Sequence, residues 1–325
     1  MEQDQLQKIL KRGVDHIIVE SEFRARLEEG KPLRLKMGFD PSSTDIHVGH
    51  AVGLRKLRQL QDMGHKVVLI VGDWTAQIGD PSGRSATRPI LTHEQVVANA
   101  ETYLAQFFKI VDRDRTEVRW QSDWFGSFTL TDVIKLTSQF TVAQFLQRDD
   151  FANRFASNQP IAITELLYPL LQAYDSVEIQ SDVEFGGTDQ MSNLLVGRDL
   201  QEKMGQRPQQ CFLVPLLVGT DGVQKMSKSL NNYIGIDEPA NDIFGKTMSL
   251  PDSMIVSYFD LLTDISDEDV AEIKHVIDDQ AGNPMDVKKR LASDLVTQFH
   301  SAEAARDAQA FFERTVQGRG IPEDI

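Results

Sequence analysis

Residues 33–71, LRLKMGFDPSSTDIHVGHAVGLRKLRQLQDMGHKVVLIV, contain the pattern that decides the fold class. Apolar and basic residues alternate at the start of this stretch, and a period of two predicts a β-strand over 33–39. An amphipathic stretch over 47–63 predicts a helix that ends at Gly64. The run KVVLIV at 66–71 is short, β-branched and apolar, as buried parallel strands are. Strand, helix and strand in succession predict a βαβ unit and therefore an α/β fold.

The same reasoning predicts further elements after this unit. A loop at 79–83 precedes a helical stretch at 92–110. Further strands are expected at 116–121, 177–181 and 211–218, and further helices at 132–155, 163–174 (with a break in register at Pro169) and 190–204. After Tyr233 the pattern consists of acidic helix caps and helical periods, so we place a boundary near 220–235.

The composition indicates a globular chain and excludes several classes of protein. The 325 residues are 41% hydrophobic and 26% charged, and the length suggests two packed units. No apolar run approaches the ~20 residues of a membrane span, and the N-terminal residues lack the apolar core of a signal peptide. A net charge of −15 argues against indiscriminate nucleic-acid binding but allows a local basic patch. The single cysteine, Cys211, excludes an internal disulfide and favours a cytoplasmic location.

The segment HVGH at 47–50 stands at the start of a predicted helix that follows a strand. A helix N-terminus presents free N–H groups and positive potential, which suit phosphate. His47 and His50 fall on the same face of the first turn, so each can donate a hydrogen bond to a phosphate oxygen. Gly49 leaves room for a flat base against the backbone. A metal-binding pair or a simple helix cap remains the alternative for this motif alone.

The segment KMSKS at 225–229 lies beyond the last predicted strand and follows Thr220-Asp-Gly222. Two lysines and two hydroxyls in a loop after a glycine suit a mobile clamp on a polyphosphate. A solvated basic loop is the alternative for any Lys-x-x-Lys taken alone. The order and distance of the two motifs make their combination more specific than either part.

These two segments resemble the HIGH and KMSKS signatures of class I aminoacyl-tRNA synthetases. Four further segments resemble the tyrosyl-tRNA synthetases in particular: GFDP at 38–41, GDPSGR at 79–84, YPLLQAYD at 168–175 and GGTDQ at 186–190. The resemblance spans about residues 30–235. It is closer to the bacterial subgroup with KMSKS than to the subgroup whose loop reads KFGKT.

The resemblance implies how tyrosine is bound. Asp175 matches the position that binds the phenol, and a carboxylate is a suitable acceptor for its O–H. A site built for that hydroxyl can reject phenylalanine strongly. Tyr168 and Gln172 share a helix face with Asp175 at spacings of four and three residues, and with Asp80 they match positions around the substrate ammonium group. The implied tyrosine-binding residues are Lys36, Asp80, Tyr168, Gln172, Asp175 and, near the carboxylate, Gln190.

Two positions depart from the family pattern. A tyrosine two places before the glycine of GFDP also binds the phenol in the major bacterial subgroup, and Lys36 stands there in this chain. Either Asp175 holds the hydroxyl without that tyrosine, or Lys36 pairs with Asp175 or with another acid. Arg84 replaces a lysine of the family, and Arg88 lies one turn further on; both suit the stabilisation of pyrophosphate.

The implied reaction has two steps. The tyrosine carboxylate attacks the α-phosphorus of ATP, giving tyrosyl-adenylate and pyrophosphate, and a ribose hydroxyl of the terminal adenosine of tRNA then takes the tyrosyl group. Catalysis of the first step needs positioning and charge stabilisation rather than a protein nucleophile. The implied catalytic residues are His47, His50, Arg84, Arg88, Lys225 and Lys228. The implied ATP-binding residues are Gly38, Asp40, Ser42, His47, Gly49, His50, Gly187, Asp189 (on the ribose), Leu217, Val218, Lys225, Met226, Ser227, Lys228 and Ser229. Mg²⁺ is expected to arrive with ATP, and no dedicated protein metal site is expected.

The resemblance also implies an architecture. It is a Rossmann-like parallel sheet over 1–222 with a helical insertion at about 126–159, followed by the KMSKS loop and an α-helical domain over 223–325. The insertion forms the dimer interface in the family, so we expect a homodimer. Three aromatic residues fit either this interface or the chain's own core: Phe140, Phe145 and Phe151. Bacterial members continue into a C-terminal RNA-binding domain that this sequence does not show, so we expect good tyrosine activation and poor charging of tRNA.

Three other functions remain open. A tryptophan-specific enzyme of the same class shares both signatures, but Tyr168, Gln172 and Asp175 argue against it. An inactive, RNA-binding relative would be expected to show eroded signatures, and both signatures are intact. A nucleotidylyltransferase also uses a His-x-Gly-His element, but it would be expected to lack the 168–190 block.

Overall fold

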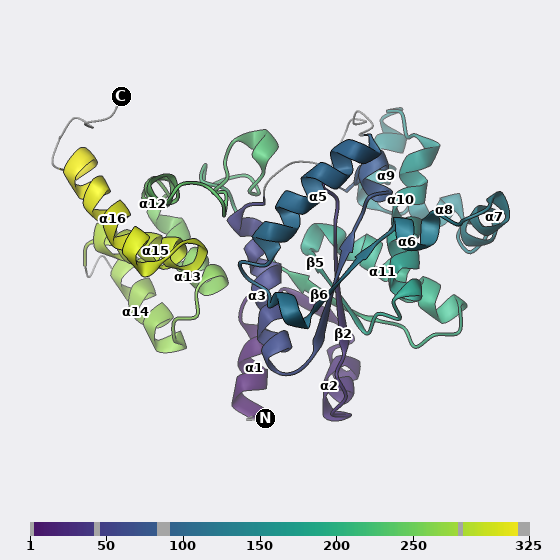
Figure 1. Ribbon diagram of the computed structural model, residues 1–325, viewed down its shortest axis with the longest axis horizontal. Helices are drawn as coiled ribbons and strands as arrows, with labels where there is room; N and C mark the ends of the chain where they lie inside the picture. Colours follow the sequence, from purple (N-terminus) through teal and green to yellow (C-terminus); the bar gives the residue numbers. More distant parts are fainter. Residues whose placement is uncertain (1–2, 42–45, 83–91, 279–281, 318–325) are drawn as a thin grey trace. The chain divides into compact units, whose positions relative to one another are not determined.

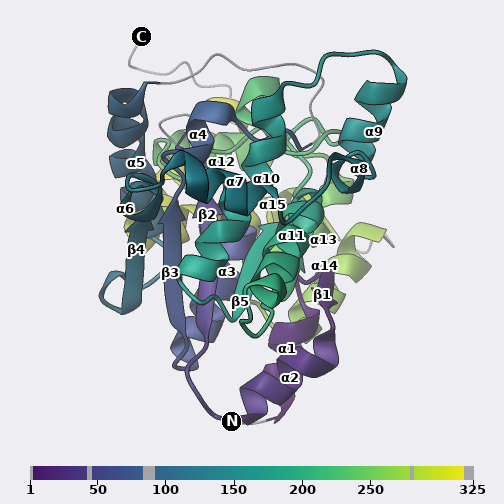
Figure 2. The same cartoon turned by 90° about the vertical axis from the view of Figure 1, so that its right-hand side faces the viewer.

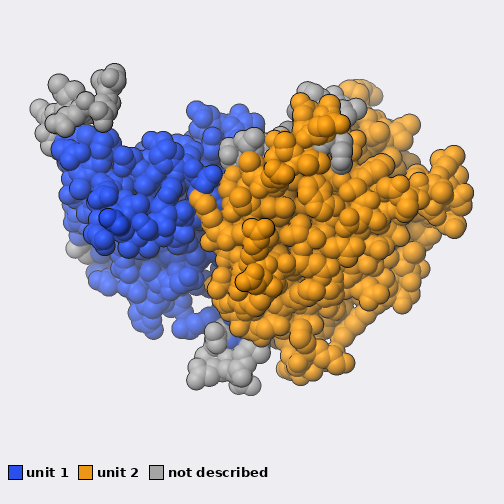
Figure 3. All heavy atoms as spheres, in the orientation of Figure 1, with its two compact units in different colours: residues 1–13, 45–55, 216–325 blue, residues 14–44, 56–215 orange. Residues whose placement is uncertain are grey.

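The computed structural model describes residues 3–41, 46–82, 92–278 and 282–317 (Figure 1). The chain folds into two compact units, which Figure 3 colours separately. Unit 1 comprises residues 1–13, 45–55 and 216–325, and unit 2 comprises residues 14–44 and 56–215. The units therefore alternate along the sequence. The consecutive scheme of 1–222 and 223–325 stays a prediction.

The described residues of unit 2 form a six-stranded sheet. Its strands are β1 (His16–Ile18), β2 (Arg34–Phe39), β3 (Lys66–Val71), β4 (Thr116–Trp120), β5 (Val183–Gly187) and β6 (Gln210–Val214). The strand order is β1-β6-β5-β2-β3-β4, and only the pair β1–β6 is antiparallel. The chain order reverses between β2 and β5, and ligands of open α/β sheets bind at the carboxyl ends of strands beside such a switch point. The predicted α/β class with a parallel sheet is confirmed.

The central strands are buried on both faces, as expected for parallel strands covered by helices. The five residues Val67–Val71 of β3 are all fully buried. In β2, Leu35 and its neighbour Lys36 are also fully buried, so the alternation of apolar and basic residues there does not mark a solvent-exposed face. A lysine therefore lies inside the sheet, next to the switch point.

Helices of unit 2 connect and cover these strands. They are α2 (Glu20–Glu28), α4 (Thr75–Ile78), α5 (His93–Phe107), α6 (Ser122–Phe125), α7 (Leu130–Thr137), α8 (Val142–Phe145), α9 (Asp149–Ala156), α10 (Ile163–Glu178) and α11 (Met191–Lys203). Helix α10 packs against α11, which packs against β5 and β6 (Figure 2). Helix α10 leads to the switch-point strand β5, so its side chains can reach the carboxyl edge of the sheet.

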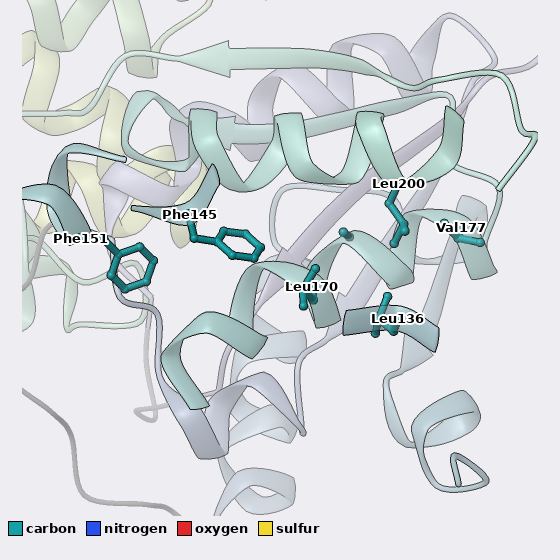
Figure 4. Close-up of a cluster of buried hydrophobic side chains, with 7 residues drawn as sticks. Leu136, Phe145, Phe151, Leu170, Val177 and Leu200 are labelled. Carbon is teal, nitrogen blue, oxygen red and sulfur yellow. The ribbon is translucent and has the colours of Figure 1, made fainter. Parts of the chain in front are cut away.

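The region predicted as one helical stretch at 132–155 is three short helices, α7, α8 and α9. The single stretch was wrong because Thr141 starts a new helix: its side chain and that of Gln144 form a reciprocal capping box. Two of the aromatics in this region, Phe145 and Phe151, are buried within unit 2 beside Leu170 of α10 (Figure 4). Of the two positions left open for these rings, they occupy the chain's own core, with Phe140 half-buried at its edge.

Three further differences concern the ends of elements. The strand predicted at 177–181 is wrong, because α10 continues to Glu178 and carries Leu170, Ala173 and Val177 into one apolar cluster at helical spacing. The helix passes through Pro169 without ending there. The strand predicted at 211–218 ends at Val214, before a proline that cannot donate to a ladder.

Unit 1 is helical in its described part. Its helices are α1 (Gln3–Lys11), the first turns of α3 (Val48–Asp62), α12 (Ala240–Met248), α13 (Ile255–Leu262), α14 (Asp267–Asp278), α15 (Pro284–Phe299) and α16 (Ala302–Phe312). Phe244, Tyr258, Phe259 and Leu295 are fully buried. Arg12 donates to the carbonyls of Phe259 and Asp260 near the end of α13, where a cation is favourable. The predicted α-helical part after the KMSKS segment is confirmed.

None of the described helices is long and apolar enough to cross a bilayer.

Candidate active site

The start of α3 holds the two signature histidines in a defined hydrogen-bonding state. The amide of Val48 donates to the carbonyl of Ile234 at 2.9 Å, which fixes the backbone at this point. The amide of His47 donates to Nδ1 of His50, and the amide of Gly49 donates to Nδ1 of His47, both at 3.2 Å. An imidazole nitrogen that accepts a hydrogen bond carries no proton. Both neutral rings therefore have their N–H at Nε2, where it can be donated to a ligand.

The environment of His47 keeps its ring neutral. Burial is the largest cause that lowers the pKa of His47 to about 2, and the neighbouring His50 and the cation of Lys228 act in the same direction. The ring thus acts as a neutral donor throughout the physiological range. A Cβ on Gly49 would lie 2.9 Å from two ring atoms of His47, so this glycine is needed to seat the histidine.

The KMSKS segment is a loop held by one side chain that the sequence did not single out. Asn232 is buried, accepts from the amide of Ser227 at 2.8 Å, and donates to the carbonyl of Lys225 at 3.1 Å. Asn232 also donates to the carboxylate of Asp221 at 2.8 Å. Met226 is buried beneath the loop, and its amide donates to the carbonyl of Leu217 at 2.8 Å. Val218 also forms an antiparallel bridge with Lys225. Backbone hydrogen bonds therefore connect the predicted ATP-binding residues Leu217 and Val218 with the start of the KMSKS segment.

The two signatures meet within unit 1. The Nζ atom of Lys228 lies 5.9 Å from the centre of the Tyr233 ring, and the His47 ring lies 6.4 Å from the same ring. Lys228 is close enough to His47 to affect its pKa. Lys225 and Ser229 are exposed, and Ser227 and Ser229 join their hydroxyls at 2.9 Å. His47, His50 and Lys228 therefore form one cationic, donor-rich cluster.

Helix α10 of unit 2 carries Asp175 into the interior. This residue is only 2% exposed, and its Oδ2 atom accepts from Nε2 of Gln121 at 2.9 Å. Among the described residues no group makes a hydrogen bond to its Oδ1 atom. The indole Nε1 of Trp124 also lacks a hydrogen-bond partner there, but it is close enough to favour the charged carboxylate. A buried acceptor oxygen without a donor is suited to a ligand that brings an O–H.

Burial raises the pKa of Asp175 to about 8. The nearby cation of Lys36 and the hydrogen bond from Gln121 oppose this rise, and the carboxylate of Glu184 adds to it. The carboxyl group of the empty chain is therefore mostly protonated at neutral pH. A ligand that donates to Oδ1 would favour the ionised form.

Replacing Asp175 with asparagine is expected to stabilise the chain without tyrosine, and by more at pH 9 than at pH 6. The pKa of an aspartate in an unfolded chain is about 3.9, whereas the folded value is about 8. Between these values the folded chain binds the proton more tightly than the unfolded chain, so the carboxyl lowers stability as the pH rises. From pH 6 to pH 9 the stability gap should widen by roughly 2–3 kcal/mol. Urea unfolding of parent and variant at both pH values measures this difference in the free energy of unfolding. An equal difference at the two pH values would contradict the raised pKa of Asp175.

Tyr168, one of the predicted tyrosine-binding residues, lies against carboxylates. Its hydroxyl donates to Oδ2 of Asp40 at 2.9 Å, and Thr75 donates to the other oxygen of Asp40 at 2.7 Å. Burial raises the pKa of Tyr168 well above its ordinary value, and the charge of Asp40 and then that of Asp80 raise it further. A Cβ on Gly72 would collide with Thr75 and Asp40, so this glycine makes room for the carboxylate. The negative charge here suits a ligand ammonium group.

A series of hydrogen bonds between polar side chains connects Asp80 with the start of α11. Gln190 donates to Oδ2 of Asp80 at 2.6 Å, and Asn193 donates to the side-chain oxygen of Gln190 at 3.0 Å. Arg148 donates to Asn193 at 2.6 Å and so links the insertion to this series. A Cβ on Gly186 would lie 2.9 Å from that of Gln190. The predicted residues Asp80 and Gln190 are therefore brought together, on a support that includes two unpredicted residues.

Lys36 pairs with an acid other than Asp175. Its Nζ atom lies 2.9 Å from Oε1 of Glu184 on the neighbouring strand β5. It also donates to the carbonyl of Gln172 and to the hydroxyl of Ser176, both at 2.7 Å. The sequence left open whether Lys36 pairs with Asp175 or with another acid. In the structure it pairs with another acid, Glu184.

Comparison with known proteins identifies the family of the chain. The sequence profile of a family described as tRNA synthetases class I (W and Y) matches residues 28–317. The chain belongs to this family.

Its curated relatives cover nearly the whole chain. A tyrosine–tRNA ligase of Dehalococcoides mccartyi (strain CBDB1) is 65% identical over 323 residues, which are 99% of this chain and 82% of that protein. A tyrosine–tRNA ligase of Thermotoga maritima is 53% identical over 318 residues, which are 98% of this chain and 79% of that protein. The crystal structure of a tyrosyl-tRNA synthetase from Archaeoglobus fulgidus, complexed with L-tyrosine, has a TM-score of 0.76 at 23% identity. It covers 94% of this chain and 98% of that one. At this identity the likeness shows a shared fold, the Rossmann-like fold of the class I synthetases.

Some residues expected from the family pattern cannot be placed with the others. Ser42, Arg84 and Arg88 lie outside the described residues. Three of the predicted ATP-binding residues lie at the carboxyl ends of β2 and β5 or just beyond: Gly38, Gly187 and Asp189. In parallel sheets this is the edge at which nucleotides bind.

Sequence reasoning missed Gln121, the partner of Asp175. Its position directly after a strand was a usable signal, because side chains after parallel strands lie at the ligand-binding edge. Its side-chain oxygen accepts from the amide of Thr75 at 2.9 Å, which fixes which amide end faces Asp175. Asn232, the second of two adjacent asparagines after KMSKS, offered no comparable signal.

Proposed function

We propose that the chain is a tyrosine–tRNA ligase. It activates L-tyrosine with ATP to tyrosyl-adenylate and pyrophosphate, and then transfers tyrosine to the 3′-terminal adenosine of its tRNA. The observation that carries the choice of substrate is the buried Oδ1 atom of Asp175, which has no hydrogen bond from the described residues. The names and high identity of the curated relatives support the same substrate and do not favour tryptophan or an inactive relative.

The residues of unit 2 bind tyrosine. The phenol O–H donates to Oδ1 of Asp175, and the aligned Gln121 amide holds the other carboxylate oxygen. The ammonium group lies among Asp80, Tyr168 and Gln172. The tyrosine carboxylate, which is ionised at neutral pH, lies near Gln190 and acts as the nucleophile without help from a protein base.

The residues of unit 1 bind the phosphates of ATP. The neutral rings of His47 and His50 donate from Nε2, and the ammonium groups of Lys225 and Lys228 supply positive charge. Arg84 and Arg88 are proposed for the same task from the family pattern alone. No group of three or more His, Cys, Asp or Glu in the described part of the chain could hold a metal. Mg²⁺ is proposed to arrive with ATP and to be coordinated mainly by the phosphate oxygens.

The chain is proposed to act as a cytoplasmic homodimer joined through the insertion at about 126–159. Phe145 and Phe151 are buried in the protomer and are not available for this contact. Helix α7 instead exposes Leu130 and Ile134, which share one of its faces, by 75% and 58%. Exposed apolar side chains grouped in this way are typical of interaction surfaces.

Tyrosine-dependent exchange of pyrophosphate into ATP tests the proposal, with tryptophan and phenylalanine measured alongside. Strong exchange with tyrosine alone is the expected result, and it requires no tRNA. Exchange with tryptophan would overturn the choice of substrate. A folded chain that binds ATP but exchanges with none of the three amino acids would overturn the activity itself.

A further inference from the structure

We propose that Lys36 and Glu184 form a buried pair that positions the turn of α10 carrying Gln172 and Asp175, and that Lys36 acts on tyrosine only through this turn. Lys36 is thus a positioning residue, and the sequence-based expectation of direct contact with tyrosine is replaced. This inference rests on the proposed function, because it concerns how the same site recognises tyrosine.

The pair is built into the register of the sheet. Lys36 of β2 and Glu184 of β5 are direct partners across these parallel strands. Their side chains are 0% and 1% exposed. Since β2 and β5 flank the switch point, the pair lies in the middle of the sheet, beneath α10.

Lys36 uses its whole donor capacity inside the protein. An ammonium group has three N–H donors and no acceptor. Nζ lies 2.9 Å from Oε1 of Glu184, 2.7 Å from the carbonyl of Gln172 and 2.7 Å from the hydroxyl of Ser176. No donor of Lys36 therefore remains for a ligand.

The contacts of Lys36 bracket the acid that binds the phenol. Gln172 and Ser176 stand at the two ends of the turn of α10 that carries Asp175. The carbonyl of Gln172 and the hydroxyl of Ser176 converge on one charged atom, so this turn is tied to β2 at two points. A shift of the turn would move both the carboxyl of Asp175 and the side chain of Gln172.

Glu184 completes the network from the other strand. Its Oε1 atom accepts from Nε2 of Gln172 at 3.0 Å, and its Oε2 atom accepts from Ser176 at 3.3 Å and also from Gln209. This hydrogen bond to a buried carboxylate fixes the orientation of the Gln172 side chain. Buried ion pairs seldom stabilise a fold more than apolar residues of the same volume. The contacts of this pair run to a substrate-binding turn, which supports a role in recognition.

The test compares the parent chain with the double variant K36M/E184Q. This variant removes the ammonium donors and keeps the interior neutral, so neither charge is left alone. We expect a folded protein whose KM for tyrosine in pyrophosphate exchange rises about tenfold, with the KM for ATP and kcat nearly unchanged. We also expect its preference for tyrosine over phenylalanine to fall. A folded double variant with the tyrosine KM and the phenylalanine discrimination of the parent overturns the proposal.

R26M is the matched control. Arg26 is also buried, and it donates to the backbone carbonyls of Asp182 and Pro208 before β5 and β6 begin. Its loss removes a buried cation from the same unit without touching α10. We expect R26M to have a lower Tm than the parent and an unchanged KM for tyrosine. A rise in KM equal to that of the double variant would overturn the specific role of Lys36.

Ser176→Ala decides the question if the double variant does not fold. This change removes one of the two anchors on α10 and leaves the charged pair intact. A rise of about threefold in the KM for tyrosine supports the proposal, and parental values for KM and discrimination overturn it. An inactive parent chain would instead overturn the proposed function, which separates the two failures.

Discussion

Replacing Asp175 with alanine is expected to lower the preference for tyrosine over phenylalanine by about 10³-fold, measured as the ratio of the two kcat/KM values in pyrophosphate exchange. The parent site presents a buried carboxyl oxygen that has no hydrogen bond from the described residues. Phenylalanine would leave that oxygen unpaired, and the cost of an unpaired buried group is what excludes it. Alanine removes the group, so phenylalanine loses its penalty while tyrosine loses its partner.

Two further variants make the result specific. Glu178→Ala removes an exposed carboxylate from the same helix and should leave the ratio unchanged. Asp175→Asn keeps an acceptor oxygen and should give an intermediate ratio. If Asp175→Ala keeps the parental ratio in a folded protein, another group recognises the phenol and the proposed role of Asp175 is wrong.

The fold was predictable where its causes are local. The βαβ unit at 33–71 is visible because periods of 2 and 3.6 residues succeed one another within it. The strand expected at 177–181 failed because Val177 and Ile179 alternate with polar residues over only a few positions, a pattern that fits the end of a helix as well as a strand. The choice depended on packing: Val177 completes a helical row with Leu170 and Ala173 in a cluster whose other members come from distant segments.

The candidate site shows the same division. Tyr168, Gln172 and Asp175 could be grouped from the sequence because one helix sets their spacing. The partner of Lys36 could not be identified, because Glu184 reaches it only through the order of the strands in the sheet. Gln121 and Asn232 act through side-chain hydrogen bonds to groups that are not their helix or strand neighbours. No periodicity in a single sequence encodes such contacts.

Replacing Lys228 with methionine is expected to lower the rate of tyrosyl-adenylate formation by about 10²–10³-fold and to leave the Kd for tyrosine nearly unchanged. The ammonium of Lys228 belongs to the same cluster as the neutral donor His47, within unit 1. Charge develops on the β- and γ-phosphates only as the α-phosphorus bond breaks. A donor that meets this charge stabilises the transition state more than the bound substrates, so its loss appears in the rate. Single-turnover formation of the adenylate, with tyrosine Kd measured separately, distinguishes the two quantities.

His50→Ala should behave in the same way, because its Nε2–H donor serves the same phosphates. Lys246→Met is the matched control: Lys246 lies 4.7 Å from the centre of the Tyr233 ring and pairs with Glu238, but it is outside both signatures. Its loss changes the local charge by the same amount as the loss of Lys228. If the control slows adenylate formation equally, the effect is one of general electrostatic potential, not of a positioned donor. If Lys228→Met weakens tyrosine binding as much as it slows the reaction, the lysine acts on the ground state, and its assignment to the transition state is wrong.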